Sequence, residues 1–166
     1  MSDLKALMLA EPRLTLAVAE SLTCGRLQAR IGAISGASGF LLGGMTAYTI
    51  DVKASQLGVD RAEAAAVNSV SSRVAEQMAI GACRLFGADL GVATTGYAEP
   101  SAEWGVVAPY AWWGLARRGP GGDFSLASGR VECPGLSRVE VQERVAEAAL
   151  AALTGSLRGR SAARTT

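Results

Sequence analysis

The feature that most constrains the fold is the alternation of short apolar runs with helical segments along the first two thirds of the chain. The apolar runs have the length and composition of buried strands, at residues 14–19, 41–49 and 88–95. Helical segments surround them at residues 2–11, 23–31, 51–57 and 71–86. A glycine-rich turn then joins two hairpin strands, residues 104–116 and 124–131, before a last helix at 137–153. This order predicts an α/β fold, a three-layer α/β/α sandwich with a mixed sheet.

The length of 166 residues predicts a single domain, which we place at residues 1–154. Residues 155–166 contain three arginines and no acid, have no apolar period, and are expected to form a flexible tail. Without them the chain holds 13 bases and 15 acids, and this near-neutral balance argues against nucleic acid as a partner. The uncharged stretch at residues 31–50 is too rich in glycine and hydroxyl groups for a membrane span.

The absence of histidine limits the chemistry available to this chain. It rules out the Ser-His-Asp and Cys-His arrangements for nucleophilic catalysis, and the His-based zinc motifs. The three cysteines are far apart and form no C-x-x-C, so we expect neither a metal site nor a disulfide framework. A reducing, cytoplasmic location fits this usage. Neither a dinucleotide-binding nor a P-loop motif is present, so no cofactor is expected.

Lysine is rare in this chain, which has 14 arginines and two lysines. Unlike arginine, a buried lysine can lose its proton near neutral pH and act as a base. Lys53 follows an uncharged strand that ends near Tyr48, so it is either such a base or a surface lysine. Two serines are candidate nucleophiles. Ser21 is also a candidate helix cap, and with Thr23 and Gly25 it forms a candidate anion site. Ser38 is also a candidate turn residue.

Hydroxyl-bearing residues follow three of the expected strands. The first strand ends at Ser21, the second near Tyr48, and the third at Thr95 and Gly96. Ligands of α/β sheets bind beyond the carboxyl ends of the strands. We therefore expect these residues to meet at one edge of the sheet.

Five motifs, in order along residues 14–153, resemble the C-terminal domain of the competence/damage-inducible CinA proteins. They are A-E-S-L-T-C-G, G-A-S, G-G-M-T-A-Y-T-I-D-V-K, L-F-G-A-D-L and T-G-Y-A-E-P, which begin at residues 19, 36, 43, 85 and 95. The family is the nicotinamide mononucleotide deamidase, or nicotinamide-nucleotide amidase. The resemblance implies a metal-independent hydrolase that converts nicotinamide mononucleotide to nicotinate mononucleotide and ammonia. It also implies an α/β/α fold and a homo-oligomer.

The resemblance also implies roles for individual residues. Lys53, made neutral by burial, takes the proton of Ser38, which attacks the carboxamide carbon; Ser21 is the second choice as nucleophile. Tyr48 holds Lys53 or the oxyanion. The phosphate or oxyanion is received by the backbone near the first motif and by residues matched from the later motifs, namely Ser21, Thr23, Gly25, Thr95, Gly96 and Arg138.

The chain departs from the family pattern at several positions of these motifs. Ile50 stands where the family has asparagine, Asp51 where it has glutamate, and Cys24 and Glu99 where it has glycine. Two alternatives to the amidase therefore stay open: a domain that keeps the fold and the nucleotide pocket without turnover, and an interaction protein that works through the arginine tail.

Overall fold

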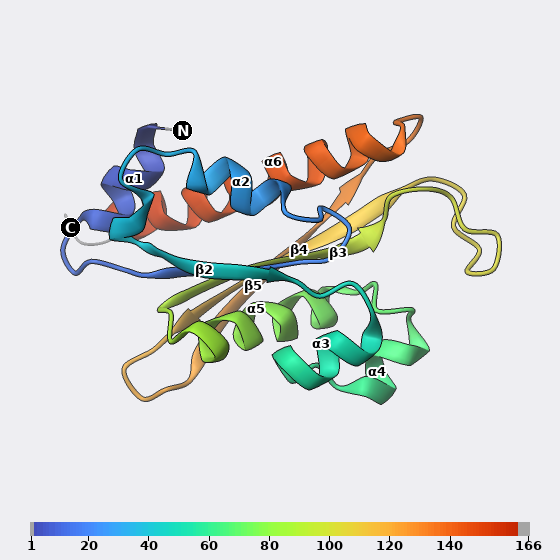
Figure 1. Cartoon of the computed structure of the whole chain (residues 1–166), viewed down its shortest axis with the longest axis horizontal. Coiled ribbons are helices and arrows are strands. Elements are labelled where there is room, and N and C mark those ends of the chain that lie inside the picture. Colours follow the sequence, from blue (N-terminus) through green and yellow to red (C-terminus); the bar gives the residue numbers. More distant parts are fainter. Residues whose placement is uncertain (1, 163–166) are drawn as a thin grey trace.

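The computed structural model of the chain describes residues 2–162. A five-stranded mixed sheet in the order β2-β1-β3-β4-β5 lies between two layers of helices (Figure 1). The strands are β1 (Leu16–Glu20), β2 (Leu41–Thr46), β3 (Leu90–Tyr97), β4 (Tyr110–Arg118) and β5 (Phe124–Glu132). The first three are parallel, and β4 and β5 extend the sheet in antiparallel fashion. The predicted three-layer α/β/α sandwich with a mixed sheet is confirmed.

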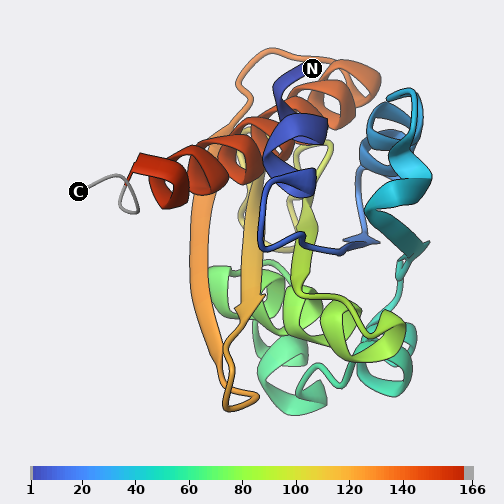
Figure 2. The same cartoon turned by 90° about the vertical axis from the view of Figure 1, so that its left-hand side faces the viewer.

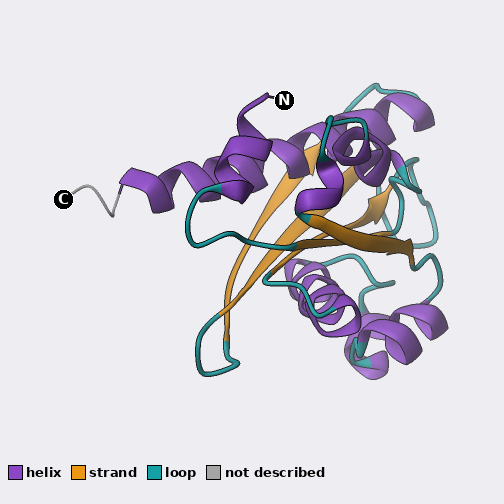
Figure 3. Ribbon diagram, turned by 60° about the vertical axis from the view of Figure 1, so that its left-hand side comes forward, coloured by secondary structure: helices purple, strands orange, loops and turns teal. Residues whose placement is uncertain are grey.

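The helices divide evenly between the two faces of the sheet (Figures 1 and 3). One face is covered by α1 (Ser2–Leu9), α2 (Arg26–Gly32) and α6 (Arg138–Ala162). The other is covered by α3 (Ile50–Leu57), α4 (Arg61–Ala66) and α5 (Ser72–Phe86). A short 3-10 turn, η1 (Ala37–Gly39), precedes β2.

Strand β1 is buried on both faces and supplies both cores. Leu16 and Val18 pack with α1, α2 and α6, whereas Ala17 and Ala19 pack with α5 on the other face. The small residues let α5 approach the sheet closely. A Cβ added at Gly91 of β3 would lie 2.0 Å from a backbone oxygen of α5, so only glycine fits there.

The last helix is longer than predicted. It includes residues 155–162, which belong to the segment that was expected to be a flexible tail. Helix α6 continues through Ala162, and its second half lies beside α1 (Figure 2). Leu157 is buried with Leu4 and Met8 of α1, and Arg158 forms an ion pair with Asp3. Packing of this apolar stripe is what keeps residues 155–162 helical. Arg164 and the rest of residues 163–166 lie outside the described residues.

Other differences are local. Helix α4 was not predicted. Strand β4 begins at Tyr110 and not at residue 104, because residues 101–106 form a small turn closed by a bridge between Ser101 and Val106. Within residues 2–162, every helix is too short or too polar to cross a bilayer.

Candidate active site

A cavity of about 530 Å³ lies beyond the carboxyl ends of β1, β2 and β3. Strand β1 pairs with β2 on one side and β3 on the other, so the chain changes direction across the sheet at this point. Such a switch point is where open α/β sheets bind ligands. The structure brings six of the predicted site residues to the cavity: Ser21, Tyr48, Lys53, Thr95, Gly96 and Arg138.

The centre of the cavity is a contact between Lys53 and Ser21. The Nζ of Lys53 donates to the Oγ of Ser21 at 3.0 Å and to the carbonyl oxygen of Tyr48 at 3.1 Å. Lys53 is only 2% exposed, and this burial lowers its pKa from 10.5 to about 8, because the charged form loses hydration. A substantial fraction of Lys53 is therefore neutral at mildly alkaline pH and can accept a proton.

Local sequence explains how the two side chains meet. The buried run of β1 ends at Glu20, so Ser21 comes directly off the sheet, with its N–H bonded to the carbonyl of Thr94 at 3.0 Å. Thr49 caps α3 by accepting from the N–H of Val52 at 3.3 Å. This cap fixes the first turn of α3, and that turn carries Lys53 inward.

The structure corrects the choice of Ser38 as the partner of Lys53. Ser38 is an exposed residue of η1, directly before β2. Because β2 runs parallel to β1 and its Leu41 pairs with Leu16, Ser38 lies at the amino end of these strands. Ser21 and Lys53 lie at the carboxyl end. Within one chain Lys53 therefore reaches Ser21 and not Ser38.

The expected anion site at the start of α2 is also corrected. The buried carboxylate of Glu20 already accepts hydrogen bonds from three backbone N–H groups there. The donors are Gly25 at 3.0 Å, Leu27 at 3.1 Å and Gln28 at 2.8 Å. The positive end of α2 is thus satisfied by the protein's own carboxylate, and Gly25 does not line the cavity.

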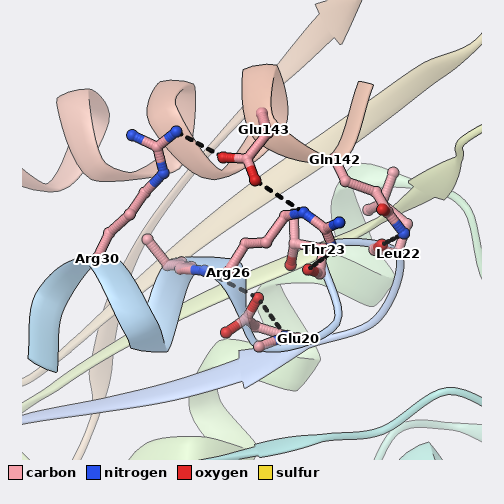
Figure 4. A network of polar contacts seen from close by, with 9 residues as sticks. Glu20, Leu22, Thr23, Arg26, Arg30, Gln142 and Glu143 are labelled. Atoms are coloured by element: carbon pink, nitrogen blue, oxygen red, sulfur yellow. Dashed lines mark hydrogen bonds and ion pairs between the residues drawn. The ribbon is translucent and has the colours of Figure 1, made fainter. Parts of the chain in front are cut away.

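Thr23 has a structural position rather than a place in the cavity. Its hydroxyl is fully buried and shares a hydrogen bond of 2.7 Å with the hydroxyl of Thr94. The Nε2 of Gln142 in α6 donates to the carbonyl of Leu22 at 2.8 Å (Figure 4). These bonds hold the turn that follows Ser21 against β3 and α6, and they orient the serine.

The start of α2 is tied to α6 by a second set of contacts. Glu143 of α6 accepts from Arg26 at 2.9 Å and from Arg30 at 2.6 Å (Figure 4). The two guanidinium groups lower the pKa of the Glu143 carboxyl, the hydrogen bond from Arg30 having the largest effect. The pairs link the helix after Ser21 to the helix that begins at Arg138.

The mouth of the cavity is formed by Arg138, Tyr48 and Glu99. Arg138 Nη2 donates to the hydroxyl of Tyr48 at 2.8 Å, and Nη1 donates to the carboxylate of Glu99 at 2.6 Å. The hydrogen bond with Glu99 is the main cause that raises the pKa of the Arg138 guanidinium. The side chain of Tyr48 is therefore bound to Arg138, and only its carbonyl contacts Lys53.

Sequence reasoning missed the loop of Asn68 and Ser69, which also lines the cavity. Both residues have positive φ, at 48° and 60°, a conformation that asparagine tolerates better than most residues. The hydroxyl of Thr95 donates to the carbonyl of Ser69 at 2.6 Å, and Asn68 donates to the hydroxyl of Tyr97 at 3.2 Å. The asparagine between two helical segments was the available signal for this turn.

Comparison with known proteins assigns the chain to a family. Residues 1–157 match the CinA C-terminal domain. The chain belongs to this family. Among curated proteins, a CinA-like protein of Chlorobium limicola is 38% identical over 144 residues, which are 86% of this chain and 33% of the relative. A putative competence-damage inducible protein of Lacticaseibacillus casei is 41% identical over 111 residues, 67% of this chain and 27% of the relative.

Solved structures of the CinA superfamily share the fold. The competence damage-inducible protein A of Klebsiella pneumoniae superposes with a TM-score of 0.85 at 28% identity, covering 95% of this chain and 94% of that one. A competence/damage inducible protein of Agrobacterium tumefaciens gives 0.66 at 28% identity, covering 96% and 94%. The chain spans a third or less of the length of the two curated CinA-family relatives.

The structure shows the surroundings of three departures from the CinA pattern. Ile50 replaces the family's asparagine and packs against the core beneath α5, and Lys53 still reaches Ser21. Asp51 pairs with Arg61 on the surface and does not touch Lys53. Glu99 replaces a glycine and binds Arg138, so this departure changes the mouth of the cavity.

Proposed function

We propose that this CinA-family domain is an amidohydrolase that converts nicotinamide mononucleotide to nicotinate mononucleotide and ammonia. The observation that carries the proposal is the buried contact of 3.0 Å between Lys53 and Ser21, with a lysine pKa lowered to about 8. A serine hydroxyl is a weak nucleophile until a base takes its proton. In a chain without histidine, a desolvated lysine is the group suited to that task.

The first half-reaction forms an ester on the enzyme. Neutral Lys53 accepts the Oγ proton of Ser21 as the oxygen attacks the carboxamide carbon. The tetrahedral intermediate then collapses, the carbon–nitrogen bond breaks, and Lys53 returns the proton to the leaving nitrogen. Ammonia departs and the acyl group stays on Ser21.

Hydrolysis of the ester completes the cycle. A water molecule attacks the acyl carbon and gives its proton to Lys53. The bond to Ser21 Oγ breaks, the serine recovers a proton from Lys53, and the carboxylic acid of the product is released. Lys53 thus acts once as base and once as acid in each half, which suits a pKa near the working pH.

Other residues at the cavity supply binding and charge stabilisation in this proposal. Arg138 is the cation at the mouth and receives the phosphate, and Tyr48 orients it through the hydroxyl contact of 2.8 Å. Thr95 holds the loop at Ser69 in place. The adjacent Gly96 lets β3 lie close to β4, because an added Cβ would lie 2.4 Å from the Cβ of Ala111. The backbone N–H of Leu22, next to the nucleophile, is the candidate oxyanion donor.

The proposal also includes metal-independent turnover, a homo-oligomeric state and a cytoplasmic location. The first is tested by assay with and without a chelator. The second is tested by light scattering of the purified protein, and the third by fractionation of the source cells.

Ammonia release from nicotinamide mononucleotide tests the proposal directly. We expect activity in the wild type and losses of at least about a thousandfold in Ser21→Ala and Lys53→Ala. Ser38→Ala is the matched control, since it removes the same hydroxyl from a serine outside the cavity, and it should keep near wild-type activity. Circular dichroism checks that each variant is folded.

Two outcomes would contradict parts of the proposal. Loss of activity in Ser38→Ala together with full activity in Ser21→Ala would overturn the assignment of the nucleophile. Binding of the nucleotide by calorimetry with no ammonia released by the wild type would favour a binding domain without turnover.

A further inference from the structure

The guanidinium at the mouth of the cavity is already occupied by an acid of the same chain. Arg138 donates to Glu99 at 2.6 Å, and both side chains are about half exposed, at 45% and 60%. Glu99 lies two residues beyond the end of β3, Arg138 begins α6, and both residues line the cavity. Any anion that binds Arg138 from the cavity meets this carboxylate.

The charges of the residues that line the cavity also disfavour a bound anion. Its basic residues are Lys53 and Arg138, and its acidic residues are Glu99 and Glu103. When Lys53 is in the neutral form that accepts a proton, one guanidinium faces two carboxylates. The lining then has a net negative charge, which disfavours a phosphate monoester that carries close to two negative charges.

We propose that Glu99 is a specificity-determining residue that competes with the substrate's phosphate for Arg138. This inference rests on the proposed function, and it concerns the phosphate of the substrate, whose binding the site weakens. The phosphate binds Arg138 only by displacing Glu99, and it then lies beside the displaced carboxylate. The nucleoside without phosphate makes no such demand. Glu99 therefore narrows the affinity gap between a pyridine mononucleotide and its nucleoside.

The size of the effect follows from the exposure of the pair. Exposed ion pairs are screened by water and salt, so one pair contributes little. A dianionic phosphate beside Glu99 is repelled by the carboxylate through each of its two charges. The phosphate also loses part of its attraction to Arg138. We expect removal of the Glu99 charge to tighten nucleotide binding about tenfold relative to nucleoside binding.

The test measures dissociation constants in a background that cannot turn over substrate. Ser21→Ala protein is titrated by calorimetry with nicotinamide mononucleotide and with nicotinamide riboside, alone and combined with Glu99→Gln. The expected result is a rise of about tenfold in the nucleotide preference, which is the ratio of the two dissociation constants. Glu103→Gln is the matched control, because it removes one negative charge from the same lining without a contact to Arg138, and it should shift the ratio less than twofold.

A further combination tests the route through Arg138. In a background with Arg138→Gln, the substitution of Glu99 should shift the ratio less than threefold, since there is no guanidinium left to compete for. An unchanged ratio in Glu99→Gln, or an equal shift in Glu103→Gln, would overturn the inference. Failure to bind either ligand would overturn it as well. Tight binding with the expected shift but no ammonia release from the wild type would refute the amidase function and leave the role of Glu99 intact.

Discussion

Replacement of Lys53 by methionine should stabilise the protein at neutral pH while it abolishes the proposed activity. Methionine is similar in length and apolar, and it fills the 2% exposed site without a charge. The lysine, by contrast, is held in a site that lowers its pKa from 10.5 to about 8. At about 1.4 kcal/mol per pH unit, this shift corresponds to a destabilisation of about 3 kcal/mol at pH 7.

The direction of the pH dependence follows from proton binding to Lys53 in the folded and the unfolded chain. Below pH 8 both the folded and the unfolded chain hold the proton, and the destabilisation is fully present. Between pH 8 and 10.5 the folded form has released the proton and the unfolded form still holds it, so wild-type stability rises with pH. At pH 10 less than about 1 kcal/mol of the destabilisation is left.

Two lost hydrogen bonds oppose this gain. The methionine no longer donates to Ser21 or to the carbonyl of Tyr48, which costs about 2 kcal/mol in total. We therefore expect Lys53→Met to be about 1 kcal/mol more stable than wild type at pH 7 and about 1 kcal/mol less stable at pH 10.

Urea unfolding followed by tryptophan fluorescence at pH 7 and pH 10 measures this difference for the two proteins. Taking the difference cancels the other groups that titrate in this range. A stability difference that is the same at both pH values would refute the reasoning. So would a variant that is less stable by several kcal/mol at pH 7.

Three further predictions concern the pH profile, the α2 terminus and the end of α6. The kcat/KM for the amide should rise about tenfold per pH unit up to about 8 and then level off, because only neutral Lys53 accepts the serine proton; a flat profile from pH 6 to 9 would contradict this. Glu20→Gln should lower the free energy of unfolding by about 2 kcal/mol in denaturant titrations, since an amide cannot accept all three backbone N–H bonds. Leu157→Ala should destabilise the protein by about 3 kcal/mol, whereas a loss below about 0.5 kcal/mol would mean that this end of α6 is not packed in solution.

Most of the secondary structure was predictable, because strands and long helices leave periodic apolar patterns. The runs at β1 and β3 and the period of α5 were found within two residues of their observed ends. Helix α4 was missed, although Asp60 caps it by accepting from the N–H of Glu63, and the D-R-A-E pattern was the available signal. The end of α6 was missed because its apolar stripe is sparse and is recognisable only once α1 lies beside it.

The candidate site was predictable in part. The scarcity of lysine singled out Lys53, and the order of strands brought the ends at Ser21, Tyr48 and Thr95 to one edge. The choice between two serines was not accessible in this way. It depends on which end of β2 each one occupies and on the direction of that strand relative to β1.

The sequence by itself determined the class of fold and the chemical groups available for catalysis, because periodicity and composition depend only on residues that are close together in the chain. Only the tertiary structure decided which groups meet. Lys53 contacts Ser21 across 32 positions, and Arg138 contacts Glu99 across 39. The carboxylate of Glu20 takes the helix terminus that the sequence offered to a ligand. Such contacts follow from strand order and from the competition of buried polar groups for hydrogen-bond partners, which no local pattern records.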